Sequence, residues 1–143
     1  MPNGSLMMMK TYLPRRPLIA VADSDDIQAQ VVSVWLDHHG FDMVRFDTGE
    51  ELLAWAQRDL ESRADAVLVD VDVIAGTGAE LCDELRSLPA YRDTPTLFVG
   101  DMQADVLEQR ARTAGACSAL TKDEDLLPRL TEWLTGLLPA VVY

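Results

Sequence analysis

Short apolar segments of strand length alternate with segments of helical periodicity along most of this 143-residue chain. The first apolar segment, residues 18–22, is continuous and partly β-branched, as expected for a strand buried on both faces of a parallel sheet. The predicted strands cover residues 18–22, 42–46, 66–70, 96–99 and 117–120. Because a helical pattern follows each one, the sequence predicts an α/β fold with five βα units in a doubly wound parallel sheet.

Capping residues set several of the helix boundaries. Gly40 and Gly115 each follow a helical pattern and are expected to end it in the left-handed conformation. Thr48, with a glutamate three residues later, forms a capping-box pattern at the start of the second helix. We expect the third helix over residues 79–87 and the last helix from near Asp125. The three tryptophans occupy apolar helical positions, which predicts that they pack in the core.

Three of the predicted strands end at a charged residue. The first runs into Asp23, the third ends on Asp70, and Lys122 follows the fifth. The carboxyl ends of parallel strands line one crevice, so we expect these three side chains to converge there. Two carboxylates can hold a divalent cation, and a lysine ammonium can neutralise a phosphoryl oxygen. This arrangement predicts an aspartate that accepts a phosphoryl group.

Composition excludes some classes of partner. The net charge of −12 opposes binding to nucleic acid, which depends on Lys and Arg clusters, and to anionic membrane surfaces. No segment approaches the ~20 apolar residues of a membrane helix. The apolar run at residues 6–9 is too short for a signal-peptide core, so we expect a cytoplasmic protein. Cys82 and Cys117 lack a CxxC spacing, which predicts buried, reduced thiols.

The length fits one domain. We expect a flexible N-terminal arm over residues 1–17, a folded domain over 18–138 and a short tail over 139–143. No effector domain follows the predicted domain in this sequence, so we expect a partner protein to provide the output.

Residues 18–138 resemble the receiver domain of bacterial two-component response regulators, which has a flavodoxin-like fold with strand order 2-1-3-4-5. The match rests on Asp23 at its distance from Gly40, on Asp70 and on Lys122. Further matching positions are Phe41, the run Gly49-Glu50-Glu51-Leu52, Gly78, Ala114-Gly115-Ala116 and Leu120-Thr121.

The resemblance implies a function for each of these residues. Asp70 corresponds to the phosphoacceptor, which takes a phosphoryl group from a histidine kinase or phosphotransfer protein. Asp23, Asp70 and the main-chain carbonyl of Asp72 would bind Mg²⁺, and Lys122 would balance the developing negative charge. A downstream effector protein is the second implied partner. A receiver domain is not an enzyme beyond its own phosphorylation and dephosphorylation.

Several positions depart from the family pattern. Ser24 replaces the second acid of the metal-binding pair, so we expect weak Mg²⁺ binding, with Asp25 or Asp26 either substituting through a water or capping the helix. Gly100 replaces the hydroxyl residue that ends the fourth strand. Ser24, Asp25 and Gly100 are therefore auxiliary site candidates. The other departures are Ile74 and Asp123 at family proline positions and Ala119 at the aromatic position of the fifth strand.

Two alternatives to phosphotransfer remain at the level of sequence. The departures above are compatible with a pseudo-receiver, a protein-interaction module that signals without phosphorylation. The segment Asp70-Val71-Asp72-Val73 also resembles the nucleophile motif of haloacid dehalogenase-type phosphatases. Steady turnover of a phosphate ester would indicate the phosphatase, whereas a receiver domain forms at most one acyl phosphate per chain.

Overall fold

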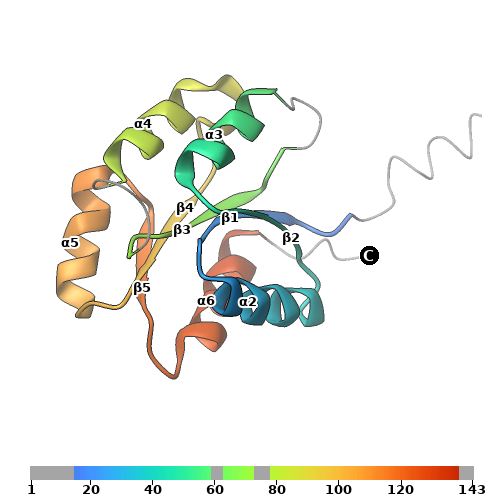
Figure 1. Ribbon diagram of the computed structural model, residues 1–143, viewed down its shortest axis with the longest axis vertical. Coiled ribbons are helices and arrows are strands. Elements are labelled where there is room, and N and C mark those ends of the chain that lie inside the picture. The colour runs from blue at the N-terminus through green and yellow to red at the C-terminus, as the bar shows by residue number, and fades with distance from the viewer. Residues whose placement is uncertain (1–14, 59–62, 73–77, 139–143) are drawn as a thin grey trace, which may run out of the picture.

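The computed structural model describes residues 15–58, 63–72 and 78–138, which form a five-stranded parallel sheet between two layers of helices (Figure 1). In chain order the elements are β1 (Leu18–Ala22), α2 (Asp26–His38), β2 (Asp42–Phe46), α3 (Gly49–Arg58), β3 (Ala66–Asp70), α4 (Ala79–Ser87), the short 3-10 helix η1 (Pro89–Tyr91), β4 (Thr96–Gly100), α5 (Ala104–Ala114), β5 (Ser118–Thr121) and α6 (Leu126–Leu137). The strand order is β2-β1-β3-β4-β5, which confirms the predicted fold class and order.

Alternating strand residues divide the core into two layers, because successive side chains point to opposite faces of a sheet. Ile19 and Val21 of β1 face α2 and α6, whereas Ala20 and Ala22 face the layer of α3, α4 and α5. Every residue of β3 and β4 is buried. These two neighbouring strands therefore form a rigid centre from which their carboxyl ends project.

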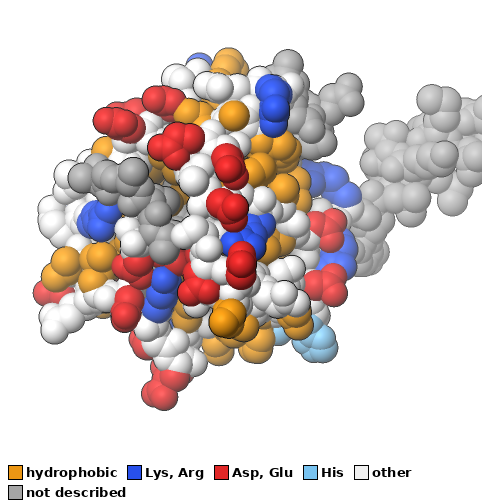
Figure 2. All heavy atoms as spheres, viewed as in Figure 1, with side chains coloured by type: hydrophobic (Ala, Val, Ile, Leu, Met, Phe, Trp, Pro, Cys, Tyr) orange, Lys and Arg blue, Asp and Glu red, His pale blue; other side chains and the backbone are white. Residues whose placement is uncertain are grey.

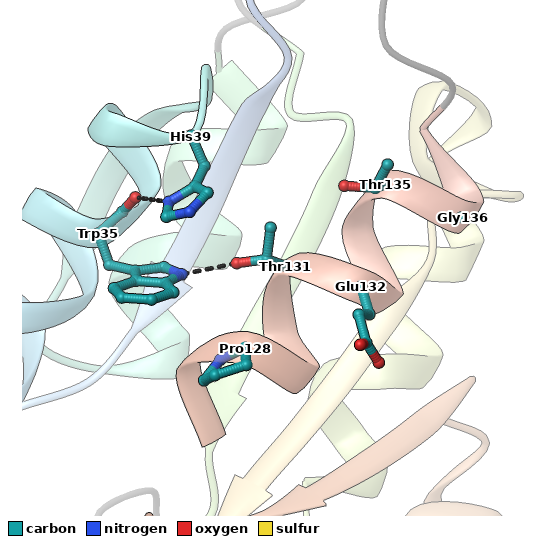
Figure 3. A pocket seen from close by; sticks show the side chains of 7 residues that line it. All are labelled: Trp35, His39, Pro128, Thr131, Glu132, Thr135 and Gly136. Atoms are coloured by element: carbon teal, nitrogen blue, oxygen red, sulfur yellow. Dashed lines mark hydrogen bonds between the residues drawn. The ribbon is translucent and has the colours of Figure 1, made fainter. Parts of the chain in front are cut away.

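The α2–α6 layer is joined by a polar contact at its surface. Trp35 Nε1 of α2 donates a 2.6 Å hydrogen bond to Thr131 Oγ1 of α6, and the indole stacks on His39 (Figure 3). A groove lies beside this contact, lined by Trp35, His39, Pro128, Thr131, Glu132, Thr135 and Gly136. The three tryptophans are half-buried, and Trp55 and Trp133 pack against the two core layers, which confirms the prediction of core packing for these two.

Most local predictions are confirmed, with small corrections. Gly40 and Gly115 have φ values of +89° and +85°, as expected for left-handed caps. Thr48 Oγ1 accepts from the N–H of Glu51, but the Glu51 carboxylate accepts from the N–H of Asp47 rather than that of Thr48. The expected box is thus displaced by one residue at its amino end.

The fifth strand begins at Ser118, one residue later than predicted, and this shift has a consequence for the cysteines. Cys82 is buried in α4, but Cys117 lies before β5 and is exposed, so the prediction of two buried thiols is wrong for Cys117. Both thiols are free. The calls on residues 1–14, on Ile74 and on the tail 139–143 lie outside the described residues.

The surface agrees with the charge pattern. On the face seen in Figure 2, Lys and Arg side chains are scattered among acidic ones, and the described residues form no continuous basic patch there. Among the described helices, none combines the length and the apolar character needed to cross a membrane.

Candidate functional site

Asp70 and Lys122 form an ion pair at the carboxyl edge of the sheet. Asp70 is the last residue of β3 and its side chain is 2% exposed, because helices cover both faces of this strand. Lys122 follows β5, where its main-chain N–H donates to the carbonyl of Gly100. Its Nζ lies 2.6 Å from Oδ2 of Asp70. The two side chains that the sequence predicts to converge are therefore in direct contact.

Lys122 also contacts a second carboxylate. Its Nζ lies 2.9 Å from Oδ2 of Asp72. Burial alone would lower the pKa of Lys122, but hydrogen bonds with Asp70 and Asp72 outweigh it, and the pKa lies above its usual value. Lys122 is therefore a permanent ammonium between two acids.

The second oxygen of Asp70 is held by the main chain. Oδ1 accepts a 3.0 Å hydrogen bond from the N–H of Asp72, which closes a tight turn after β3. Among the described residues, Oδ2 has no polar partner other than Lys122. The carboxylate is thus fixed in orientation, with one oxygen on a main-chain N–H and the other on the ammonium of Lys122.

Asp23 supplies the second buried carboxylate. It follows β1 and is 3% exposed, and its Oδ1 accepts from the N–H of Asp25 at 2.9 Å. Its pKa is raised to about 6, chiefly by burial; the Asp25 N–H opposes the rise and the negative charge of Asp70 adds to it. Lys122 favours the charged form of Asp23 and so lowers this pKa, while it pairs directly with Asp70.

The donor set at this edge fits a hard cation such as Mg²⁺, which prefers oxygen ligands and retains several waters. Asp23 and Asp70 would provide two carboxylates, and a divalent ion would neutralise their unbalanced charge. Within the described ranges, no three His, Cys, Asp or Glu side chains are grouped as metal ligands. A cation would therefore depend on two carboxylates, a main-chain oxygen and water.

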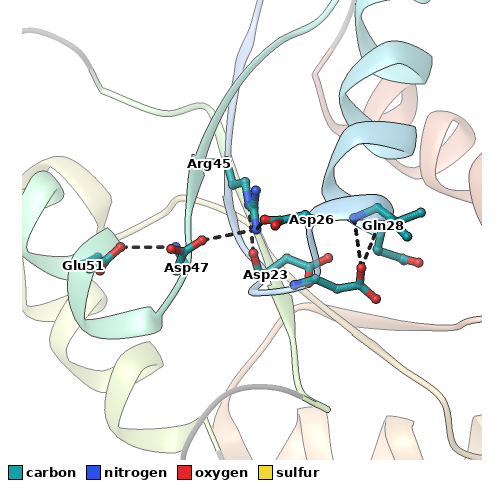
Figure 4. A network of polar contacts seen from close by, with 8 residues as sticks. Asp23, Asp26, Gln28, Arg45, Asp47 and Glu51 are labelled. Atoms are coloured by element: carbon teal, nitrogen blue, oxygen red, sulfur yellow. Dashed lines mark hydrogen bonds and ion pairs between the residues drawn. The ribbon is translucent and has the colours of Figure 1, made fainter.

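The other acids of the β1–α2 segment are engaged elsewhere (Figure 4). Asp25 Oδ1 accepts from the N–H groups of Ile27 and Gln28, which makes it the N-cap of α2. Asp26 Oδ1 lies 2.7 Å from Nη2 of Arg45. Of the two roles considered for Asp25 from the sequence, the helix cap is the one observed. Asp26 is instead paired with Arg45.

Arg45 is a supporting residue that the sequence reasoning missed. From β2, its Nε donates to the carbonyl of Asp23 at 3.0 Å, and its Nη2 lies 3.2 Å from Oδ1 of Asp47 (Figure 4). It pairs in register with Val21 of β1, directly before the site. The signal available was a lone arginine within an otherwise mostly apolar strand. Its guanidinium ties the β1–α2 turn, and hence Asp23, to β2.

Gly100 ends β4 with no room for a side chain. A Cβ at this position would lie 2.7 Å from Cγ2 of Val71 and 3.1 Å from Cδ1 of Leu107. The space is thus filled by apolar atoms from the turn after β3 and from α5. The auxiliary candidate Gly100 contributes its carbonyl, which anchors Lys122, but no hydroxyl.

Comparisons with known proteins found similar chains over most of this sequence. The family model described as "Response regulator receiver domain" matches residues 19–132. The chemotaxis response regulator CheY4 of Vibrio cholerae is 26% identical, with a TM-score of 0.74 over 86% of this chain and 99% of that one. A response regulator from Chloroflexus aurantiacus is 25% identical, with a TM-score of 0.76 over 87% and 99% of the two chains.

A curated relative is much longer than this chain. The 3',5'-cyclic-nucleotide phosphodiesterase regA of Dictyostelium discoideum is 27% identical over 95 residues, which are 66% of this chain and 12% of that protein. The similarity therefore concerns a small part of that relative.

Proposed function

This chain belongs to the response regulator receiver family, the signalling modules of two-component systems, and we propose that Asp70 is its phosphoacceptor. Proteins of this family generally interact with histidine kinases or phosphotransfer proteins and with effectors. One observation carries the proposal: the buried Asp70 ends a central strand with the ammonium of Lys122 2.6 Å from Oδ2. A nucleophile and a compensating cation are the two groups that phosphoryl transfer to a carboxylate requires.

The proposed step is a displacement at phosphorus. A carboxylate oxygen of Asp70 attacks the phosphorus of a phosphohistidine on the donor protein, the P–N bond breaks, and its electron pair stays on the imidazole, which takes up a proton. The product is an acyl phosphate on Asp70. Lys122 stays within reach of the new phosphoryl oxygens and balances their charge.

Asp23 and Asp70, with a main-chain oxygen near Asp72, would hold Mg²⁺. When bound, the ion reduces the repulsion between the carboxylates and an incoming phosphoryl group. Ser24 provides no charge, and Asp25 and Asp26 are engaged with α2 and Arg45. Because affinity for hard cations increases with ligand charge, the proposed binding is weaker than at a site with three carboxylates.

The proposal also covers the organisation of the chain. We assign residues 18–138 to the receiver domain, 1–17 to an arm and 139–143 to a tail. We also propose that the protein is cytoplasmic and that a downstream effector protein provides the output. The proposed activity of the chain is limited to its own phosphorylation and dephosphorylation.

The test is treatment of the purified protein with acetyl phosphate and Mg²⁺, followed by intact mass measurement. We expect the mass to rise by one phosphoryl group and the rise to disappear in Asp70→Asn and in excess EDTA. Asp101→Asn, which removes an exposed carboxylate close to the site, is the matched control and should keep the label. A label that persists in Asp70→Asn would contradict the assignment. A wild-type protein that takes up no label would support a pseudo-receiver. Continuous hydrolysis of a generic phosphate ester would support a phosphatase.

A further inference from the structure

Asp72 connects the charged site to the segment that follows β4. A single oxygen, Oδ2, lies 2.9 Å from Lys122 Nζ and also accepts a 2.8 Å hydrogen bond from the main-chain N–H of Asp101. Asp101 is the first residue after β4, and residues 101–103 lead into α5. One carboxylate oxygen is therefore shared between the cation of the site and the β4–α5 connection.

The strand end itself offers no such link. Gly100 has no side chain, and Val71 and Leu107 fill the space that a side chain would need. A group on Asp70 therefore cannot attract a hydroxyl at the end of β4. Among the described residues, the Asp72 carboxylate makes the side-chain contact between the site and the residue directly after Gly100.

We propose that Asp72 is a positioning residue that couples the charge on Asp70 to the β4–α5 connection. This inference rests on the proposed function of Asp70. A phosphoryl group adds roughly −1.5 to −2 charges. Its oxygens compete with Asp72 for the ammonium of Lys122, and they repel the Asp72 carboxylate. When Lys122 leaves Asp72, the N–H of Asp101 is the partner that remains for Oδ2. The geometry of this hydrogen bond therefore differs between the unphosphorylated and the phosphorylated protein.

The connection is well placed for a partner to read this change. Asp101 and Gln103 are exposed and Met102 is half-buried, so a partner can contact residues 101–103 directly. A ligand shifts a conformational equilibrium only through contacts that differ between the two states, and the Lys122–Asp72 contact is such a difference. With Gly100 and Ala119 lacking a hydroxyl and a ring, residues 104–120 should change little. The phosphorylation-sensitive surface is therefore the short connection rather than α5 or β5.

The test compares amide NMR spectra of the full chain with and without beryllofluoride and Mg²⁺, a phosphoryl mimic. In the wild type we expect shifts at residues around Asp70 and Lys122 and at Asp101, with small shifts over 104–120. In Asp72→Ala the shift at Asp101 should be lost while those around Asp70 remain. Glu124→Gln removes the same charge from an exposed residue near Lys122 and should keep the wild-type response.

Asp72→Asn distinguishes coupling through the Lys122–Asp72 ion pair from simple structural support of the Asp101 N–H. Asparagine keeps an oxygen that can accept from the N–H of Asp101 but cannot form the ion pair with Lys122. We expect normal protection of the Asp101 amide against hydrogen exchange, together with a reduced beryllofluoride shift. A full response in Asp72→Asn or a persistent Asp101 shift in Asp72→Ala would overturn the proposal.

A comparison without any phosphoryl mimic keeps the two hypotheses apart. Lys122→Gln should shift the Asp101 amide in the wild-type background and leave it unchanged in the Asp72→Ala background. Equal shifts in both backgrounds refute the coupling through Asp72. A wild type with no beryllofluoride response at any residue instead refutes the proposed function of Asp70, and the regulatory role with it, even where the Lys122→Gln comparison succeeds.

Discussion

Replacing Asp23 by asparagine should stabilise the metal-free protein at neutral pH. The pKa of Asp23 is raised from 3.8 to about 6 in the folded state. At neutral pH the folded protein therefore carries a charge that the unfolded chain accommodates more easily. A difference of roughly two pKa units corresponds to about 3 kcal/mol of folding free energy, which is an upper limit because Lys122 loses an attractive partner in the variant. Asparagine keeps an oxygen for the Asp25 N–H.

The sign of the pH dependence follows from the raised pKa. Below about pH 4 the carboxyl group of Asp23 is protonated, and its burial does not reduce the free energy of unfolding. As the pH rises towards about 6 the buried group ionises, and the free energy of unfolding of the wild type falls. Asp23→Asn should match the wild type at pH 4 and exceed it at pH 7.5.

Urea denaturation in EDTA at both pH values measures this difference. The control Asp101→Asn removes an exposed carboxylate and should show no comparable gain. Added Mg²⁺ should narrow the gap, because an ion bound only to the folded wild type stabilises it. A variant that is no more stable than the wild type at pH 7.5 in EDTA would show that burial of the Asp23 charge is not costly.

Three further substitutions test the surroundings of the site. Gly100→Thr should destabilise the protein by about 1–3 kcal/mol, because the new Cβ overlaps Val71. Adding Val71→Ala should recover part of this loss, and an unchanged urea midpoint in Gly100→Thr would contradict the packing. Ser24→Asp should tighten Mg²⁺ binding in a titration followed by tryptophan fluorescence, and unchanged affinity would show that the added carboxylate does not reach the ion. Arg45→Gln should speed amide exchange in the turn after β1 and weaken Mg²⁺ binding, whereas wild-type exchange there would show that the guanidinium does not hold the turn.

The positions of the strands could be predicted because buried strands consist of continuous apolar runs in the sequence. All five residues of β3 are buried, and its apolar run marks both its limits and its functional end at Asp70. The order of the strands came from the resemblance to receiver domains, since periodicity carries no information about which strands are neighbours. Cys117 was placed wrongly because strand boundaries are uncertain by a residue or more, and this residue lies just before β5, where its side chain is exposed.

The supporting contacts of the site could not be predicted in the same way. Arg45 in a strand is read as a solvent-facing residue until the fold brings the carbonyl of Asp23 and the carboxylate of Asp26 to its guanidinium. The contact between Val71 and Gly100 depends on packing of the turn after β3 against the end of β4, which are distant in sequence. Such contacts depend on tertiary geometry and leave no local pattern.

The balance of charge at the sheet edge links stability, metal binding and signalling. Lys122 is placed against Asp70 and Asp72, and no Lys or Arg of the described residues forms an ion pair with the buried Asp23. The pKa of Asp23 is raised chiefly by burial, and the negative charge of Asp70 adds to the rise; a divalent ion bound here would offset both effects. A phosphoryl group on Asp70 would change the same balance, because it would draw Lys122 away from Asp72. The residue left with unmatched charge is then Asp72, whose remaining partner is the Asp101 N–H. With a glycine at the end of β4, the proposed signal is the redistribution of Lys122 between Asp70 and Asp72.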